Sequence, residues 1–162
     1  MKRPLVIGIG GGHSGSGKTT LASALLAHLS SVGERWGAVK YTKTAIYCSI
    51  IDDREILCQK DKDTERFFRS GAVEVLWVQS PEQELGEVVP MAIDRLSHLD
   101  GIILEGNSAI EFLKPDVVLF LSGDSHRRPK ASGERLLSTA DIIIVESPPE
   151  GMGEPKGKPT CT

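Results

Sequence analysis

At 162 residues the chain has the length of one α/β domain and is long enough to bury a core. Its composition, 40% hydrophobic and 25% charged, is ordinary for a soluble globular protein, and no stretch approaches the ~20 apolar residues of a membrane span. A net charge of -3 argues against nucleic acid or an acidic membrane as a partner, and an odd number of cysteines, three, favours a reducing cytoplasm.

The first predicted elements are a strand, a glycine-rich loop and a helix. The apolar run Leu5–Ile9 predicts a buried strand, and Leu21–Leu29 predicts a helix. Between them lies the motif G-x-x-x-x-G-K-[ST], read here as Gly12-His13-Ser14-Gly15-Ser16-Gly17-Lys18-Thr19. Its glycines let backbone N–H groups surround a di- or triphosphate at a helix N-terminus. Lys18 is expected to reach the β- and γ-phosphates, and the Thr19 hydroxyl to bind Mg²⁺.

The later elements alternate between strands and helices, with an irregular stretch predicted over Thr42–Lys62. Further strands are predicted over Trp36–Tyr41, Ala72–Val78, Asp100–Asn107, Asp116–Leu121 and Asp141–Val145. Helices are predicted over Asp63–Arg69, from a cap at Ser80 to about His98, and over Gly133–Leu137. This alternation predicts an α/β fold, a mostly parallel doubly wound sheet of P-loop NTPase architecture. Residues 1–146 are expected to form a single nucleotide-binding domain, and the Pro/Gly-rich residues 147–162 a flexible tail.

Several polar residues follow apolar strands, where the carboxyl ends of parallel strands gather ligands. Glu105 ends the run Ile102-Ile103-Leu104 and is a candidate both for binding Mg²⁺ and for orienting an attacking water. Asp52 and Asp53 lie where nucleotide switches often place a metal-contacting acid, although a solvated loop explains them equally well. The catalytic candidates are Lys18 and Glu105. The metal candidates are Thr19, Glu105 and Asp52. The residues expected to bind the nucleotide are Gly12, His13, Ser14, Gly15, Ser16, Gly17, Lys18, Thr19, Thr20 and Lys40.

Two other groups have a chemical and an ordinary interpretation. The basic loop Ser122–Lys130 suits a second anionic ligand or a transferred phosphoryl group, but basic surface loops are common. Cys48, Cys58 and Cys161 show no zinc spacing, so idle thiols explain them better than metal ligands do.

Three segments in order resemble those of the B protein family of molybdopterin guanine dinucleotide biosynthesis. They are the phosphate loop with its strand, Gly37–Thr42, and the segment Lys62-Asp63-Thr64-Glu65-Arg66-Phe67-Phe68-Arg69-Ser70-Gly71-Ala72. The resemblance implies a cytoplasmic, GTP- and Mg²⁺-binding accessory protein with weak GTPase activity. It also implies a homodimer that acts with the molybdopterin nucleotidyltransferase or another molybdoenzyme-maturation protein.

The sequence departs from this family at three places. Lys40-Tyr41-Thr42 stands where the family has Lys-His-Thr, so a histidine contact is absent. Glu105-Gly106-Asn107 is closer to the nickel-insertion GTPases, but the metal-binding Cys and His motifs of those proteins are missing. Glu146-Ser147-Pro148-Pro149 replaces the guanine-reading Asn-Lys-x-Asp expected after the last strand, so ATP remains possible. The alternatives are a small-molecule kinase, another NTPase of metallocofactor maturation, and a binding module without turnover.

Overall fold

The computed structural model describes residues 2–13, 16–123 and 128–145, and its strands form one sheet. The strands are β1 (Leu5–Gly11), β2 (Trp36–Lys43), β3 (Ser49–Ile51), β4 (Val75–Ser80), β5 (Gly101–Glu105), β6 (Val117–Leu121) and β7 (Ile142–Ile144). The sheet has seven strands in the order β3-β4-β2-β5-β1-β6-β7. All neighbours are parallel except β3 and β4. The predicted mostly parallel sheet is confirmed.

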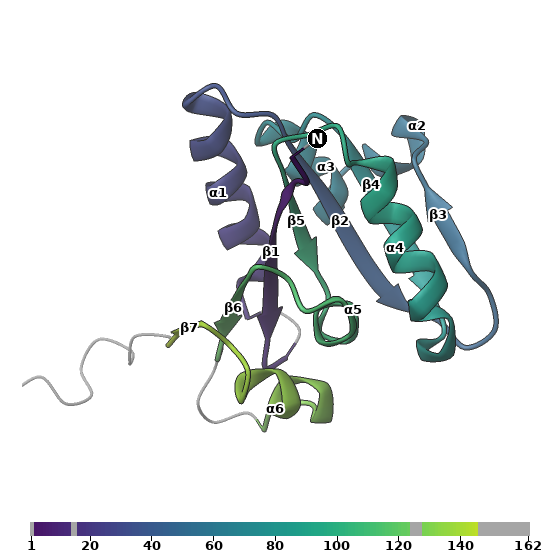
Figure 1. Cartoon of the computed structure of the whole chain (residues 1–162), viewed down its shortest axis with the longest axis vertical. Coiled ribbons are helices and arrows are strands. Elements are labelled where there is room, and N and C mark those ends of the chain that lie inside the picture. The colour runs from purple at the N-terminus through teal and green to yellow at the C-terminus, as the bar shows by residue number, and fades with distance from the viewer. Residues whose placement is uncertain (1, 14–15, 124–127, 146–162) are drawn as a thin grey trace, which may run out of the picture.

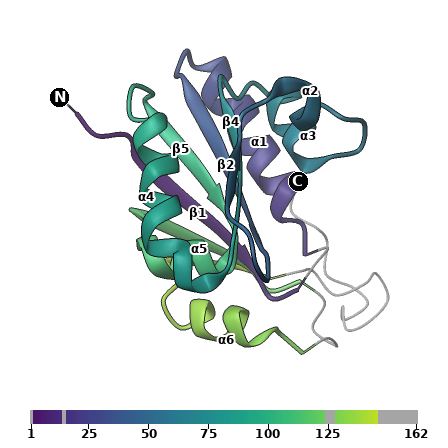
Figure 2. The same cartoon turned by 90° about the vertical axis from the view of Figure 1, so that its right-hand side faces the viewer.

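Helices cover both faces of the sheet, as Figures 1 and 2 show. They are α1 (Lys18–Ser31), α2 (Arg54–Leu57), α3 (Asp63–Arg69), α4 (Leu85–Arg95), α5 (Asn107–Leu113) and α6 (Ala131–Leu137), with a short 3-10 helix, η1 (Glu82–Glu84). Core residues of α1, α2 and α3 pack on one face, and those of α4, α5 and α6 on the other. Within the described ranges, no helix combines the length and apolar character needed to cross a bilayer.

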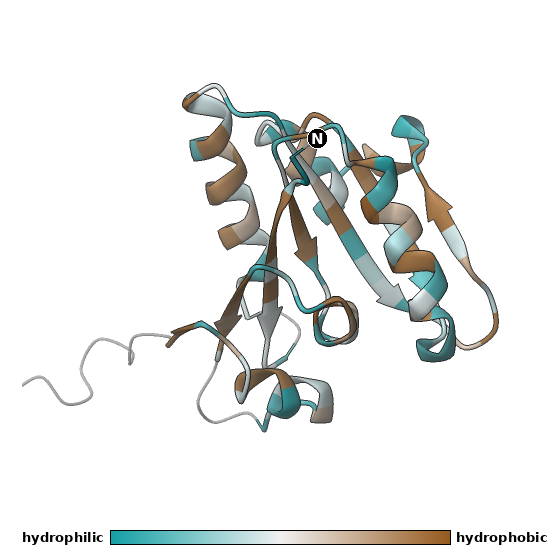
Figure 3. Cartoon of the chain, viewed as in Figure 1, coloured by the Kyte–Doolittle hydropathy of each residue, from teal (hydrophilic) through white to brown (hydrophobic). Residues whose placement is uncertain are grey.

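The core consists of two apolar layers, one on each side of the sheet. Successive strand residues point to opposite faces, so Ile102 and Leu104 of β5 join one layer while Ile103 joins the other. Apolar segments run along β5 and β6, and β2 becomes polar toward its carboxyl end (Figure 3). Phe67 of α3 and Phe120 of β6 are almost completely buried, one in each layer. These layers hold the strand ends, and hence the polar residues that follow them, in fixed positions.

The structure differs from the predicted elements in three places. The stretch predicted as irregular, Thr42–Lys62, contains the end of β2, the edge strand β3 and the single turn α2. The helix predicted from Ser80 to about His98 is shorter: Ser80 ends β4, and α4 itself spans Leu85–Arg95. The strand predicted to reach Asn107 ends at Glu105, and Asn107 begins α5. Residues 147–162 lie outside the described residues, so the tail stays a prediction.

Candidate functional site

The glycine-rich loop joins β1 to α1 at the carboxyl edge of the sheet. Gly12 N–H donates to Leu121 O at 3.0 Å, which fixes the start of the loop to β6. Gly17 precedes α1 with φ 96°, a backbone conformation that favours glycine. The buried Ser16 Oγ has no hydrogen-bond partner among the described residues. Ser14 and Gly15 lie outside the described residues.

Lys40, Glu105 and Asp63 meet beside the start of α1. Lys40 of β2 and Glu105 of β5 are register partners on neighbouring strands. The Lys40 ammonium forms an ion pair with Asp63, the first residue of α3, and lies 4.0 Å from Glu105 Oε1. The Thr19 hydroxyl is near enough to lower the pKa of both carboxyl groups. The structure therefore brings the predicted residues Lys18, Thr19, Lys40 and Glu105 together.

Burial and neighbouring charges set the electrostatics of this group. Burial raises the pKa of Glu105, against the lowering effect of Lys40 and Lys18. Partial burial alone would raise the pKa of Asp63, but its hydrogen bond to Lys40 and the charge of that lysine hold the pKa below its ordinary value. Burial also lowers the pKa of Lys18, partly opposed by the charge of Glu105. The free protein thus holds the charges of Glu105 and Lys18 at an energetic cost, whereas the charge of Asp63 is stabilised.

The carboxylate of Glu105 has the property expected of a metal ligand. The residue is 5% exposed, and its Oε2 is buried with no hydrogen-bond partner among the described residues. An unpaired buried carboxylate oxygen is costly, and Mg²⁺ prefers hard oxygen donors. A hydroxyl from Thr19 and carboxylates from Glu105 and Asp63 form such a donor set. The residues present therefore fit Mg²⁺.

Asp63 is the residue of this group that the motif analysis missed. From the sequence, the metal-contacting acid of the segment between β2 and β4 was predicted to be Asp52. The structure instead brings Asp63 to Thr19. A signal was present, because Lys62-Asp63-Thr64 belongs to the segment that carries the family resemblance.

The prediction of a metal contact from Asp52 is wrong in this structure. Because β3 runs antiparallel to β4, Asp52 lies toward the amino end of β4, at the edge of the sheet opposite the glycine-rich loop. Its Oδ2 is 4.0 Å from Arg95 Nη1, and it lines a cavity of about 580 Å³ with Glu74 and His98. A three-residue antiparallel strand reversed the direction that the prediction assumed.

The other residues predicted to bind the nucleotide or a second anion differ in their surroundings. His13 is buried beside Gly123, and the Thr20 hydroxyl accepts a hydrogen bond from Arg66 Nη2 at 3.2 Å. In the basic loop, residues 124–127 lie outside the described residues, but Lys130 N–H donates to Gly12 O at 2.9 Å. The Lys130 charge also lowers the pKa of Lys18, after the larger effect of burial. Thus at least the end of the basic loop lies beside the phosphate loop.

The cysteines provide no metal centre in the described part of the chain. Cys48 and Cys58 are free and exposed. Residues 2–13, 16–123 and 128–145 contain no cluster of three or more histidine, cysteine or acidic side chains suited to a metal ion. Cys161 lies outside these ranges.

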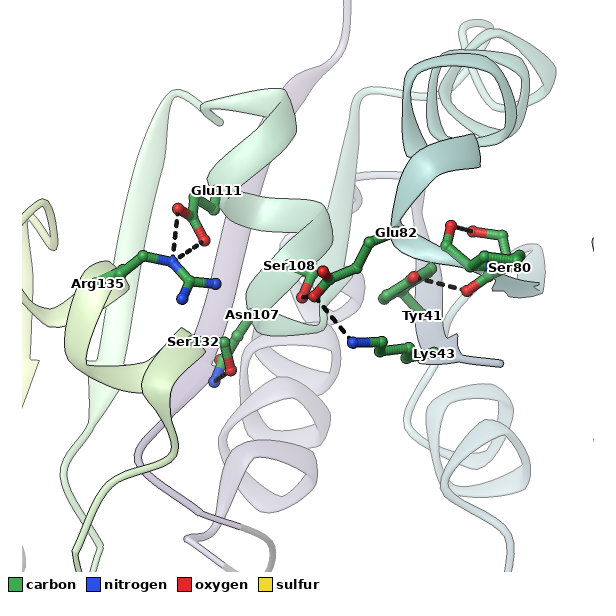
Figure 4. A network of polar contacts seen from close by, with 10 residues as sticks. Tyr41, Lys43, Ser80, Glu82, Asn107, Ser108, Glu111, Ser132 and Arg135 are labelled. Carbon is green, nitrogen blue, oxygen red and sulfur yellow. Dashed lines mark hydrogen bonds and ion pairs between the residues drawn. The ribbon is translucent and has the colours of Figure 1, made fainter. Parts of the chain in front are cut away.

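Asn107 supports the start of the phosphate loop. β5 ends opposite Ile9, while β1 continues to Gly11. The Asn107 side chain takes the place of the missing strand: its Oδ1 accepts from Gly11 N–H at 3.0 Å, and its Nδ2 donates to Gly11 O at 2.8 Å. Figure 4 shows Asn107 beside Ser132 of α6, whose Oγ is 3.4 Å from Nδ2. One amide thus joins β1, α5 and α6.

Asn107→Ala should destabilise the protein by about 2 kcal/mol, because both backbone groups of Gly11 lose their partner. Urea unfolding of the free protein measures this change. The matched control is Ser132→Ala, which removes only the long contact and should change the unfolding free energy by less than about 0.5 kcal/mol. Equal losses in the two variants would contradict the supporting role of Asn107.

Other ion pairs at this end of the molecule lie on the α4–α5–α6 face. Glu82 accepts from Ser108 Oγ at 3.2 Å and lies 3.4 Å from Lys43 Nζ, while Arg135 pairs with Glu111 at 3.0 Å (Figure 4). These groups are exposed, so each pair contributes little to stability. Lys43 is therefore a lysine near the candidate site but outside it.

Glu105→Gln should stabilise the free protein while weakening Mg²⁺-dependent nucleotide binding. Since burial raises the pKa of Glu105, its ionised form destabilises the fold at pH values above that pKa. This cost fades as the pH falls to the ordinary carboxyl range. The melting temperature of the variant should therefore exceed that of the wild type at pH 8, and the two should converge near pH 4. A variant melting below the wild type at pH 8 would contradict this account.

Comparisons with known proteins identify a matching family and a similar fold. The family of molybdopterin guanine dinucleotide synthesis protein B matches residues 6–130. Among solved structures, the kinase domain of Escherichia coli tyrosine kinase ETK superposes with a TM-score of 0.56 at 14% identity, covering 96% of this chain and 72% of that chain. At this identity the likeness shows the fold alone, which confirms the P-loop NTPase architecture. No curated protein sequence matches the chain.

Proposed function

Because the chain belongs to the family of molybdopterin guanine dinucleotide synthesis protein B, we propose that it is a GTP-binding accessory protein with weak GTPase activity in molybdenum cofactor biosynthesis. Family membership relates the chain to this pathway, and the P-loop fold implies a nucleoside triphosphate with Mg²⁺. The choice of GTP, the weak hydrolysis and the accessory role are the content of the proposal.

The single observation that carries the proposal is the buried Oε2 of Glu105, which has no hydrogen-bond partner in the described part of the chain, with Thr19 and Lys18 near its carboxyl group. A carboxylate that only ended a strand would face water or a partner. Here the charge is kept in the interior next to the hydroxyl and the lysine of a phosphate-binding motif. This arrangement suits a metal-bound triphosphate, which supplies the missing positive charge and coordination.

In this proposal the chain's own residues mainly bind and position the nucleotide. The loop amides and Lys18 contact the phosphates and stabilise negative charge on the γ-phosphoryl group. Thr19, Glu105 and Asp63 would hold Mg²⁺, which neutralises phosphate charge when it is bound. Fast GTP hydrolysis commonly needs an arginine delivered to the phosphates, often by a partner protein. Weak turnover of the isolated chain fits an accessory role.

The choice of base is tested by the thermal shift that each nucleotide produces. A ligand that binds only the native state raises the melting temperature according to its concentration and affinity. GTP with Mg²⁺ should raise the melting temperature more than ATP with Mg²⁺ does. Neither nucleotide should stabilise Lys18→Ala. Equal shifts with both nucleotides would remove the preference for guanine. Phosphoryl transfer from ATP to a metabolite, followed with labelled ATP, would instead favour a kinase.

The proposed partner is the molybdopterin nucleotidyltransferase or another molybdoenzyme-maturation protein, in the cytoplasm and with this chain as a homodimer. Light scattering after size exclusion tests the oligomeric state. Co-purification of the two proteins in the presence and absence of GTP tests the partnership. If the two proteins co-purify equally well with and without GTP, the nucleotide has no role in forming that complex.

A further inference from the structure

Lys40 occupies the space between two carboxylates of the candidate metal site. Its ammonium pairs with Asp63 and lies 4.0 Å from Glu105 Oε1. The side chains of Lys40, Asp63 and Glu105 are 24%, 34% and 7% exposed, so this contact is partly shielded from water. Opposite charges at such separations attract more strongly here than on an open surface.

The two carboxylates need a cation between them. Asp63 and Glu105 come from different elements, α3 and β5, and each lies near the Thr19 hydroxyl. Like charges in a partly desolvated site repel one another. In the free protein Lys40 supplies the compensating charge, and Glu105 Oε2 still lacks a hydrogen-bond partner within residues 2–13, 16–123 and 128–145.

A metal ion and Lys40 therefore compete for the same oxygens. Mg²⁺ carries two positive charges in a small volume and prefers carboxylate and hydroxyl oxygens. A lysine ammonium is a single charge on a flexible stem that can move by several ångströms. Lys40 also lies on the strand next to β5, at the edge of the sheet where the phosphate loop begins. A displaced Lys40 can thus turn toward the phosphates.

We propose that Lys40 is an internal counter-cation of the Asp63–Glu105 pair, and that the divalent metal arriving with a nucleotide displaces it. This inference rests on the proposed nucleotide- and Mg²⁺-binding function and names how that site is regulated. Displacement releases Asp63, the first residue of α3, from the strand β2. The metal state of the site is thereby communicated to α3.

The start of α3 is well placed to transmit this change. Its preceding residue, Lys62, lies over the Trp77 ring with Nζ 4.8 Å from the ring centroid. Thr64 Oγ1 donates to Leu57 O at 2.6 Å, which ties α3 to α2. Release of Asp63 therefore acts on a surface that includes both short helices.

Metal binding in the absence of nucleotide tests the competition directly. Mn²⁺, a spin-active substitute for Mg²⁺, is titrated into the wild type and Lys40→Met, and bound ion is measured by electron paramagnetic resonance. Removing the internal cation should increase the affinity for Mn²⁺ by about tenfold or more. A merely structural lysine would not produce a gain in metal affinity when removed.

Two further variants control the titration. Lys43→Met removes a lysine of the same strand, β2, which pairs through this lysine with Glu82 outside the site. The Mn²⁺ affinity of this variant should equal that of the wild type. Asp63→Asn combined with Lys40→Met should lose the gain, because one of the freed oxygens is gone. If Lys40→Met fails to fold by circular dichroism, Lys40→Gln replaces it.

Unchanged or weaker Mn²⁺ binding in folded Lys40→Met or Lys40→Gln would overturn the proposal. This readout uses no nucleotide, so it is independent of the preference for GTP. If the variant gains Mn²⁺ affinity but neither GTP nor ATP stabilises the wild type, the proposed function fails while the cation competition stands. If nucleotides bind but the gain is absent, the function stands and the role of Lys40 is wrong.

Discussion

Replacing Lys18 by alanine should lower the affinity for GTP by about 100-fold, because the charge-assisted contacts of this lysine to the phosphates are lost. Lys18 begins α1, immediately after the left-handed Gly17, and is coupled to the charges of Glu105, Lys40 and Asp63. No other described lysine has this combination of motif position and burial beside the loop. Isothermal titration calorimetry with GTP and Mg²⁺ measures the loss.

The free Lys18→Ala variant should remain folded and should melt at or above the temperature of the wild type. Burial lowers the pKa of Lys18, so the folded state disfavours its charged form. This cost is complete at pH values below the lowered pKa and fades as the pH rises through it. Removing the lysine removes the cost. Lys43→Ala is the control, since Lys43 is an exposed lysine at the same edge and should leave GTP affinity unchanged. Wild-type affinity in Lys18→Ala would refute the assignment of the phosphate site.

The sequence predicted those parts of the fold that depend on local pattern. Apolar runs identified the parallel strands of the sheet, and the helix Asp63–Arg69 was predicted with the bounds that the structure has. The helix α5 was missed because Glu105, Gly106 and Asn107 read as a polar strand end. The turn at Gly106 lies so close to Tyr41 that a side chain there would contact it, and the local pattern does not contain this tertiary neighbour.

The candidate site was predictable to the extent that parallel strands share a carboxyl edge. That rule placed Lys40 and Glu105 beside the phosphate loop, and their register as neighbours agrees with it. The same rule failed for Asp52, because a short edge strand can run in either direction. It also could not select Asp63, whose place depends on how α3 packs against α1 through the buried Phe67. Packing of helices decides which acid completes the site.

Glu105, Gly106 and Asn107 form a continuous segment with three different tasks. Glu105 offers a buried oxygen to the proposed metal site, and Asn107 holds Gly11 at the start of the phosphate loop. Gly106 allows both, since it turns the chain from β5 into α5 with φ 137° and ψ 118°. The turn therefore couples the acid and the support of the loop through one backbone conformation. A change at Gly106 should disturb both tasks at once.

Gly106→Ala should destabilise the protein by about 3 kcal/mol and also weaken nucleotide binding. A Cβ at this position would lie 2.9 Å from Tyr41 Cβ and 3.2 Å from Tyr41 O. Tyr41 cannot move freely, because it is buried and its hydroxyl donates to Ser80 O at 2.8 Å. The strain of the positive φ adds to this contact. Urea unfolding and calorimetry with GTP measure the two losses.

Gly33→Ala separates backbone strain from steric contact. Gly33 also has a positive φ, 86°, but a Cβ there would meet no atom within 4 Å. Its replacement should therefore cost only about 1 kcal/mol and leave GTP affinity unchanged, because Gly33 follows α1 at the end remote from the phosphate loop. If Gly106→Ala lost no more stability than Gly33→Ala and bound GTP normally, the contact with Tyr41 would not govern the position of Glu105 and Asn107. The larger, double loss is expected because a single glycine sets the direction of both side chains.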